Sequence, residues 1–128
     1  MANHCSNCIA FYGNALDKLE NFRMLMNDKC EFIRDFAMKC GYSEEETFRF
    51  TDGRDTFVEV PDVVSKDDTS YYFIIKTESA GTPNVEVFTK ILEERYNDQI
   101  DFVHCSVEFG SEIYVNTDTS GRFFSDQY

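Results

Sequence analysis

The sequence has no tryptophan, few basic residues and no long hydrophobic run, and each absence limits what the chain can be. Its 128 residues hold 12 Lys and Arg against 24 Asp and Glu, a formal net charge of -12. Such an acidic field repels nucleic acid and anionic membranes. No run of about 18 apolar residues is present, and no segment has the layout of a signal peptide. We therefore expect a soluble, intracellular protein with no membrane partner and no direct contact with nucleic acid.

The composition nevertheless supplies a core. Aromatic residues make up 16% of the chain, with 13 Phe and 7 Tyr, so the acidity is not a signature of disorder. The length suits a single domain over residues 1–128. The five cysteines are an odd number, which fits reduced thiols better than a disulfide framework.

Hydrophobic periodicity predicts alternating strands and helices. Residues 4–12 alternate as a strand. Residues 15–40 carry a helical stripe, and Asn27-Asp28 with Glu31 resembles a second N-cap that would divide it into two helices. Ser43 begins a short helix that ends near Phe50. The predicted strands are 57–60, 71–78, 100–109 and 112–117, with a polar loop at 65–70 and a helix starting at Thr82-Pro83. This order predicts an α+β sandwich whose antiparallel or mixed sheet is covered by helices on one face.

The chain begins with Asn3, Cys5 and Asn7, and Gly13 closes the predicted first strand. In these residues, and in others of its C-terminal half, the chain resembles the YubB-type ferredoxin-like family of phage and plasmid proteins. That family begins with a Met-x-Asn-Trp-Cys-x-Asn pattern and a strand closed by Gly, and here His4 stands in place of Trp. Its C-terminal half is matched by Thr77-Glu78, Pro83 and Glu108-Phe109-Gly110. The resemblance implies a ferredoxin-like, split βαβ fold and a mobile-element origin. It implies no activity and no catalytic residue, because the family is essentially uncharacterised.

Two sets of residues could carry chemistry, and for both we favour a structural interpretation. Cys5-x-x-Cys8 with His4 and His104-Cys105 is the one metal-like set, but positions three apart on a strand face opposite sides. We expect buried, reduced cysteines, with Cys5 and Cys105 both facing the core, no zinc and no Cys-His enzyme. Carboxylates near strand ends could converge on a site for Mg²⁺ or for acid–base chemistry, but we expect a solvated rim: Glu78, Glu108, Glu112 and Asp118.

Acidic residues are concentrated in two segments. Residues 43–68 carry nine acids against three bases, and residues 97–128 carry six acids against Arg122. Carboxylates repeated every three to five residues could imitate the phosphates of a nucleic acid and occupy a basic channel. We take five of them to lie in loops and exposed turns, where neutralisation would leave the fold intact: Asp52, Asp55, Asp62, Asp67 and Asp68.

The leading hypothesis is a binding protein without enzymatic activity or cofactor. It would be a phage or plasmid product, monomer or homodimer, that docks on the basic nucleic-acid-binding surface of a host defence nuclease such as a CRISPR effector. Phe48 and other aromatic residues near the acids would anchor it. The alternative is a protein that binds or cleaves a nucleotide signal, which would need Arg, Lys or a helix N-terminus. The expected partner-binding residues are Glu44, Glu45, Glu46, Asp52, Asp55, Phe57, Glu59, Asp62, Asp67, Asp68, Glu108, Glu112, Tyr114 and Asp118.

Overall fold

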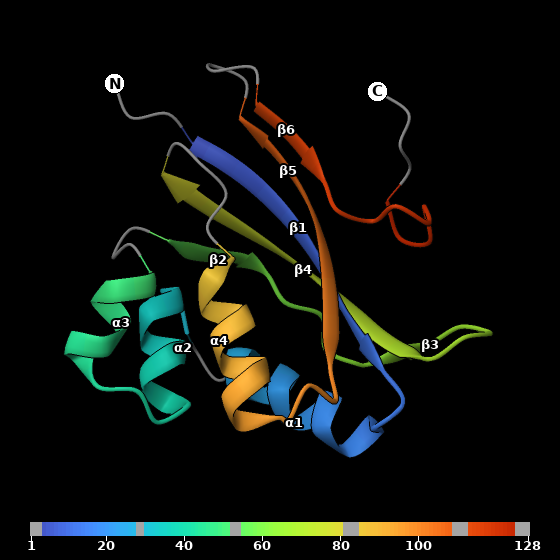
Figure 1. The fold of residues 1–128 in the computed structure, drawn as a ribbon, viewed down its shortest axis with the longest axis horizontal. Coiled ribbons are helices and arrows are strands. Elements are labelled where there is room, and N and C mark those ends of the chain that lie inside the picture. Colours follow the sequence, from blue (N-terminus) through green and yellow to red (C-terminus); the bar gives the residue numbers. More distant parts are fainter. Residues whose placement is uncertain (1–3, 28–29, 52–54, 81–84, 109–112, 125–128) are drawn as a thin grey trace.

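A six-stranded antiparallel sheet and four helices form an α+β fold in the computed structural model, which describes residues 4–27, 30–51, 55–80, 85–108 and 113–124 (Figure 1). The strands lie in the order β2-β4-β1-β5-β6, and β3 pairs with β4 beside β2. Every pairing is antiparallel. The strands are β1 (His4–Gly13), β2 (Thr56–Glu59), β3 (Ser65–Lys66), β4 (Tyr71–Ala80), β5 (Asp101–Glu108) and β6 (Ile113–Asn116).

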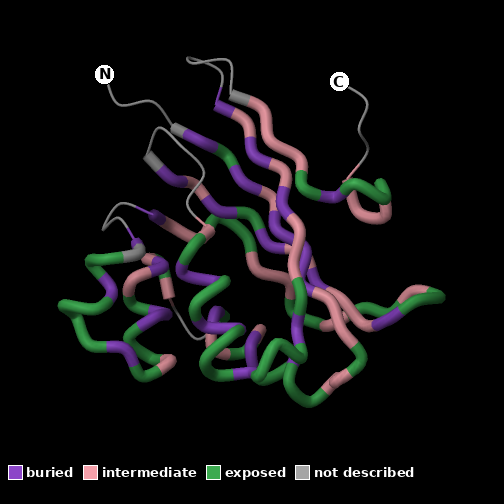
Figure 2. The backbone as a smooth tube through the Cα atoms, in the orientation of Figure 1, coloured by how far each residue is buried: buried purple, intermediate pink, exposed green. Residues whose placement is uncertain are grey.

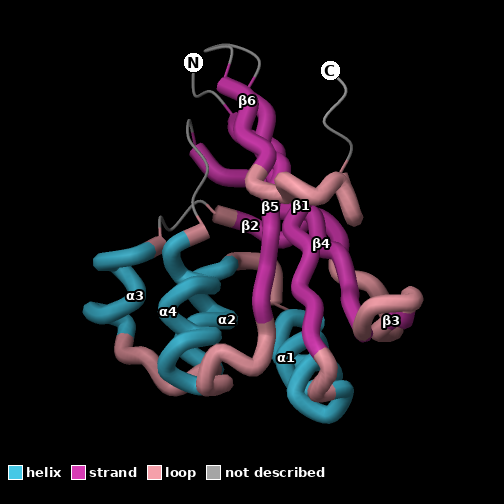
Figure 3. The backbone as a smooth tube through the Cα atoms, turned by 45° about the vertical axis from the view of Figure 1, so that its right-hand side comes forward, coloured by secondary structure: helices cyan, strands magenta, loops and turns pink. Residues whose placement is uncertain are grey.

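The helices lie together on one side of the sheet (Figure 3). They are α1 (Leu16–Asn27), α2 (Ile33–Lys39), α3 (Glu44–Phe50) and α4 (Glu86–Arg95). The predicted division of residues 15–40 into two helices is confirmed. Ser43 caps α3 in a capping box: its side chain accepts from the Glu46 N–H, and the Glu46 carboxylate accepts from the Ser43 N–H.

Three sequence predictions about element boundaries are wrong, and others fall outside the described residues. The second helix within residues 15–40 begins at Ile33 with Phe32 at its N-cap, and not at the cap predicted from Asn27-Asp28. The residues 65–70 are not all loop, because β3 pairs with β4 there. Helix α4 begins at Glu86, with Val85 at the N-cap, rather than at Thr82-Pro83. Thr82, Pro83 and the turns predicted at 52–53 and 110–111 lie outside the described residues.

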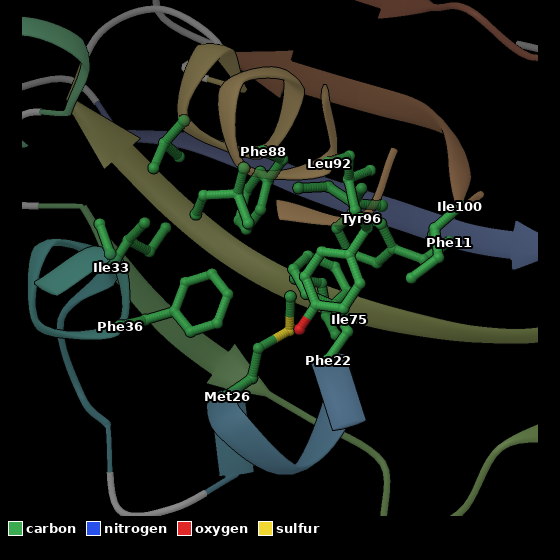
Figure 4. Packing of buried hydrophobic residues seen from close by; sticks show 14 of the residues in the cluster. Phe11, Phe22, Met26, Ile33, Phe36, Ile75, Phe88, Leu92, Tyr96 and Ile100 are labelled. Atoms are coloured by element: carbon green, nitrogen blue, oxygen red, sulfur yellow. The ribbon is translucent and has the colours of Figure 1, made fainter. Parts of the chain in front are cut away.

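Phe11 on β1 is the centre of the hydrophobic core. Its ring lies 4.9 Å from that of Phe22 on α1, 5.3 Å from Phe73 on β4 and 5.3 Å from Phe88 on α4. Phe36 on α2 joins the same cluster through Phe22 (Figure 4). A fully buried Phe contributes about 1.5–3 kcal/mol relative to an exposed one, so this aromatic contact network holds the helices on the sheet.

The opposite face of the sheet is partly covered by the C-terminal segment. The Phe123 ring packs 5.6 Å from Tyr12 and 5.1 Å from Tyr72, which are direct cross-strand partners. Buried positions follow the central strands and the inward sides of the helices, whereas the outer sides of the helices are exposed (Figure 2). None of the helices among the described residues is long and apolar enough to cross a membrane.

Candidate functional site

Several of the acids expected to face a partner are used inside the fold. Asp55 is only 1% exposed, so the prediction that it lies on an exposed turn is wrong. It lies just before β2, where its carbonyl oxygen accepts from the N–H of Ile33 and links the start of α2 to the sheet. A contact between distant segments of this kind cannot be predicted from the local spacing of acidic residues.

Asp67 is likewise an internal anchor. Its carboxylate accepts two hydrogen bonds from Arg122, Nε at 2.9 Å and Nη2 at 2.6 Å, and two more from the N–H groups of Thr69 and Ser70. The Arg122 guanidinium holds the pKa of Asp67 well below its usual range, since the charged form is the one that is hydrogen-bonded. Neutralising Asp67 would therefore disturb the fold as well as the surface charge.

Asp118 closes the turn that leads to the C-terminal segment. It is 5% exposed, and its Oδ2 accepts from the N–H groups of Phe123 and Phe124 at 2.7 and 3.0 Å. Burial raises its pKa, but these hydrogen bonds outweigh burial and the pKa lies below the usual range. Asp118 is therefore placed to shape the chain rather than to meet a partner.

The carboxylates at the strand ends that the structure describes do not converge. Ser6 pairs with both Glu78 and Val107, so Glu78 and Val107 lie on one face of the sheet, and Glu108 lies on the other. Glu78 is partly exposed, whereas Glu108 is 2% exposed. Asp118 lies beyond β6, and Glu112, like Asp52, lies outside the described residues. The expected solvated rim is wrong for Glu108 and Asp118.

Of the acids expected to face a partner, three lie next to one another at the surface of α3. Glu44, Glu45 and Glu46 are all exposed in its first turn, and Phe48 on the same helix is 57% exposed. Arg49 lies 3.7 Å from Glu45, with both side chains largely in solvent, so that pair is weak. An exposed aromatic side chain with carboxylates beside it is suited to a basic protein surface. We call Glu44, Glu45, Glu46 and Phe48 the α3 surface.

The other predicted partner-binding residues are scattered. Asp62 and Asp68 are exposed in the connections that flank β3, and Glu59 on β2 lies 3.5 Å from Lys76. Phe57 is partly buried against Phe36 at 5.8 Å, and so supports the core. Tyr114 is partly exposed on β6, an edge strand far in sheet order from β2. The structure therefore does not bring the described members of the predicted set together as one surface.

A group of buried polar side chains lies on the helix-facing side of the sheet, beyond the aromatic core. Asn7 is its hub: Nδ2 donates to Thr77 Oγ1 and Ser79 Oγ, each at 3.2 Å, and Oδ1 accepts from Cys5 Sγ at 3.6 Å. We call the group the sheet-end cluster, and its members are all less than 9% exposed: Cys5, Asn7, Thr77, Ser79, His104, Ser106 and Glu108.

The sheet-end cluster is not arranged as a nucleophilic site. His104 pairs with Ile9, four residues from Cys5 along β1, which separates the thiol and the imidazole by about 13 Å along the strand. Burial raises the pKa of the Cys5 thiol and lowers that of His104, so both groups are neutral at neutral pH. The His104 Nδ1 lies 2.9 Å from Ser106 Oγ, and Ser106 is fully buried. Among the described residues, no side-chain nitrogen or oxygen of the cluster is buried without a hydrogen-bond partner.

The register corrects the prediction that Cys5 and Cys105 both face the core. Cys105 pairs directly with Cys8, and both are partly exposed on the face that the helices leave uncovered. Cys5 lies on the opposite, buried face, as expected for a residue three positions from Cys8. Among the described residues, no group of three or more His, Cys, Asp and Glu side chains is placed to hold a metal ion.

A basic hollow lies between α1, α2 and α4, and no local pattern in the sequence indicates it. Lys18, Lys39 and Arg95 line it together with Asp17, and its volume is about 510 Å³. These four residues come from three helices up to 78 positions apart, so only the packing of the helices brings them together.

Comparisons of the chain with protein-family models, with curated proteins and with solved structures found no match.

Proposed function

We propose that the protein works by binding and not by chemistry: it is a phage- or plasmid-encoded inhibitor that docks on the basic nucleic-acid-binding surface of a host defence nuclease, such as a CRISPR effector. It would act in the cytoplasm of a bacterial host without binding nucleic acid itself. The observation that carries the proposal is the α3 surface, where three consecutive exposed glutamates accompany an exposed Phe48.

The α3 surface combines two properties that a docking site needs. The formal net charge of -12 steers the whole molecule toward a basic partner and speeds encounter. Phe48 supplies an apolar anchor, and a buried aromatic anchor carries much of the binding energy of a typical interface. The carboxylates make the protein selective for a cationic surface, and Phe48 slows its dissociation from that surface.

We also propose that the sheet is a ferredoxin-like, split βαβ arrangement. In support, β4 lies between β1 and β2, which are connected through α1, α2 and α3. Similarly, β1 lies between β4 and β5, which are connected through α4. The resemblance of the first strand and the C-terminal half to the YubB-type family supports the same arrangement and a mobile-element origin.

The test measures association of the protein with a purified CRISPR effector nuclease. Glu44, Glu45 and Glu46 are changed together to Gln, which keeps an acceptor for the capping box at position 46. We expect association to slow by about tenfold at low salt and much less at about 0.5 M salt, because steering is screened beyond a Debye length. Phe48→Ala should instead raise the dissociation rate.

The matched control neutralises three exposed acids elsewhere, Glu20, Glu31 and Glu86, and so removes the same amount of charge. It should slow association only slightly. If both triple variants slowed association equally, the α3 surface would contribute only general surface charge and not a docking site. If neither variant slowed association, the proposal would be contradicted.

A further inference from the structure

The hollow between α1, α2 and α4 carries an excess of positive charge in a strongly acidic protein. Lys18 comes from the first turn of α1, Lys39 from the last turn of α2 and Arg95 from the last turn of α4. Asp17 is the one acid among its described lining residues. Three cations against one anion make this a positive site in a chain whose formal net charge is -12.

The other ionisable groups in the wall add no negative charge. Burial raises the pKa of the Cys40 thiol to about 12 and that of the Tyr96 phenol to about 12, so both are neutral at neutral pH. The Tyr96 hydroxyl donates to Asn21 Oδ1 at 2.8 Å, which fixes both side chains in the wall. Cys40, Tyr96 and Asn21 therefore make polar but uncharged parts of the wall beside the cations.

Arg95 is held in place by its surroundings. Its guanidinium lies 4.7 Å from the centre of the Tyr42 ring, in a cation–π contact. Gly41 has a φ of 103°, and a Cβ there would lie 3.3 Å from Arg95 Nη2, so a glycine at this position leaves room for the guanidinium. An arginine held on an aromatic ring loses little conformational freedom when it binds an anion.

We infer that this hollow binds a small phosphate-bearing molecule. Its volume of about 510 Å³ lies within the usual range of small-molecule sites, about 300–1,000 Å³. Arg95 offers the fork of N–H donors that matches a phosphate group, and Lys18 and Lys39 offer point charges on other sides of the hollow. None of the α3 surface residues lines the hollow, so phosphate binding is tested separately from the proposed function.

The experiment titrates the full chain with inorganic pyrophosphate, AMP and adenosine and follows amide chemical shifts. Pyrophosphate and AMP should give saturable shifts confined to residues around Lys18, Lys39 and Arg95, and adenosine should give none. The double variant Lys18→Gln with Lys39→Gln should weaken pyrophosphate binding by about tenfold or more. Asp17→Asn should tighten it by about two- to fivefold, because it removes the negative charge of the carboxylate in the lining.

The matched control is Lys66→Gln with Lys76→Gln, which removes the same charge from exposed positions outside the hollow. It should leave pyrophosphate affinity nearly unchanged. Equal weakening by both double variants would overturn the inference in favour of a diffuse ion atmosphere. The absence of saturable shifts with pyrophosphate and AMP would also overturn it, and would mean that Lys39 and Arg95 serve only to complement the C-terminal ends of their helices.

Discussion

Arg122 binds Asp67 through two hydrogen bonds and so ties the C-terminal segment to the loop before β4, 55 residues earlier in the chain. The guanidinium also lies 5.3 Å from the Tyr12 ring and 4.5 Å from the Phe123 ring. One side chain thus joins the acidic loop and the aromatic residues on the uncovered face of the sheet.

We predict that this pair makes the protein more sensitive to acid. The pKa of Asp67 is held below its usual range, chiefly by the hydrogen bonds from Arg122, so its contribution to stability is present above the unfolded pKa of about 4. That contribution is lost as the pH falls through the lower folded pKa. Asp67→Asn should lower the midpoint of thermal unfolding by a few degrees at pH 7, and the difference from the parent should shrink in strong acid. The measurement is near-ultraviolet circular dichroism of the tyrosines against temperature, and a difference that grows on acidification would contradict it.

A second prediction concerns the cysteine pair on the uncovered face. Directly opposed residues of antiparallel strands have Cα atoms about 4.5–5.5 Å apart, within the range of disulfides. Cys8 and Cys105 are so opposed and partly exposed. We expect oxidised glutathione to convert them to an intramolecular disulfide with release of two reduced glutathione molecules, slowly, because burial raises the pKa of the Cys8 thiol.

Mass spectrometry of the oxidised and digested chain tests this pairing. A Cys8–Cys105 linked peptide should appear, and Cys8→Ser should abolish it, whereas Cys5→Ser should not because Cys5 is fully buried. Mixed disulfides with glutathione on both residues, without the linked peptide, would show that the two thiols cannot meet.

A third prediction concerns Asn7, which holds the sheet-end cluster together. Asn7→Ala removes the donor to Thr77 and Ser79 and the acceptor for Cys5. Buried polar groups left without their partners cost about 1–3 kcal/mol, so urea unfolding should show a loss of that size. Ser6→Ala, at the exposed neighbouring position on β1, should change the free energy of unfolding very little. If both variants lowered the free energy of unfolding by a similar amount, Asn7 would stabilise strand β1 in general and not the sheet-end cluster.

The sequence predicted the elements better than their contacts. The alternation of apolar and polar residues correctly predicted where β1 lies. It also predicted that Cys5 and Asn7 share a face with Ile9 and Phe11, because the pleat of a strand fixes which residues share a face. The capping signal at Ser43 was sufficient to place α3, because the bonds of a capping box are local.

The candidate sites depend on pairings that no local pattern encodes. The face of Cys105 was assigned wrongly because it depends on the β1–β5 register, which pairs it with Cys8. The burial of Asp55 depends on its contact with the start of α2. The basic hollow depends on the packing of three helices, in a chain whose acids outnumber its Lys and Arg by 24 to 12.

If the protein occupies a basic surface that would otherwise hold nucleic acid, it must compete with nucleic acid for that surface. A labelled guide RNA or target duplex is bound to a purified CRISPR effector nuclease at about 0.15 M salt, and the protein is titrated in. We expect the apparent Kd of the nucleic acid to rise in proportion to the concentration of the protein, with no ternary complex, and the triple Glu44, Glu45 and Glu46 to Gln variant to need about tenfold more protein for the same displacement. A stable ternary complex, or binding of the protein to the nucleic acid itself, would contradict the account.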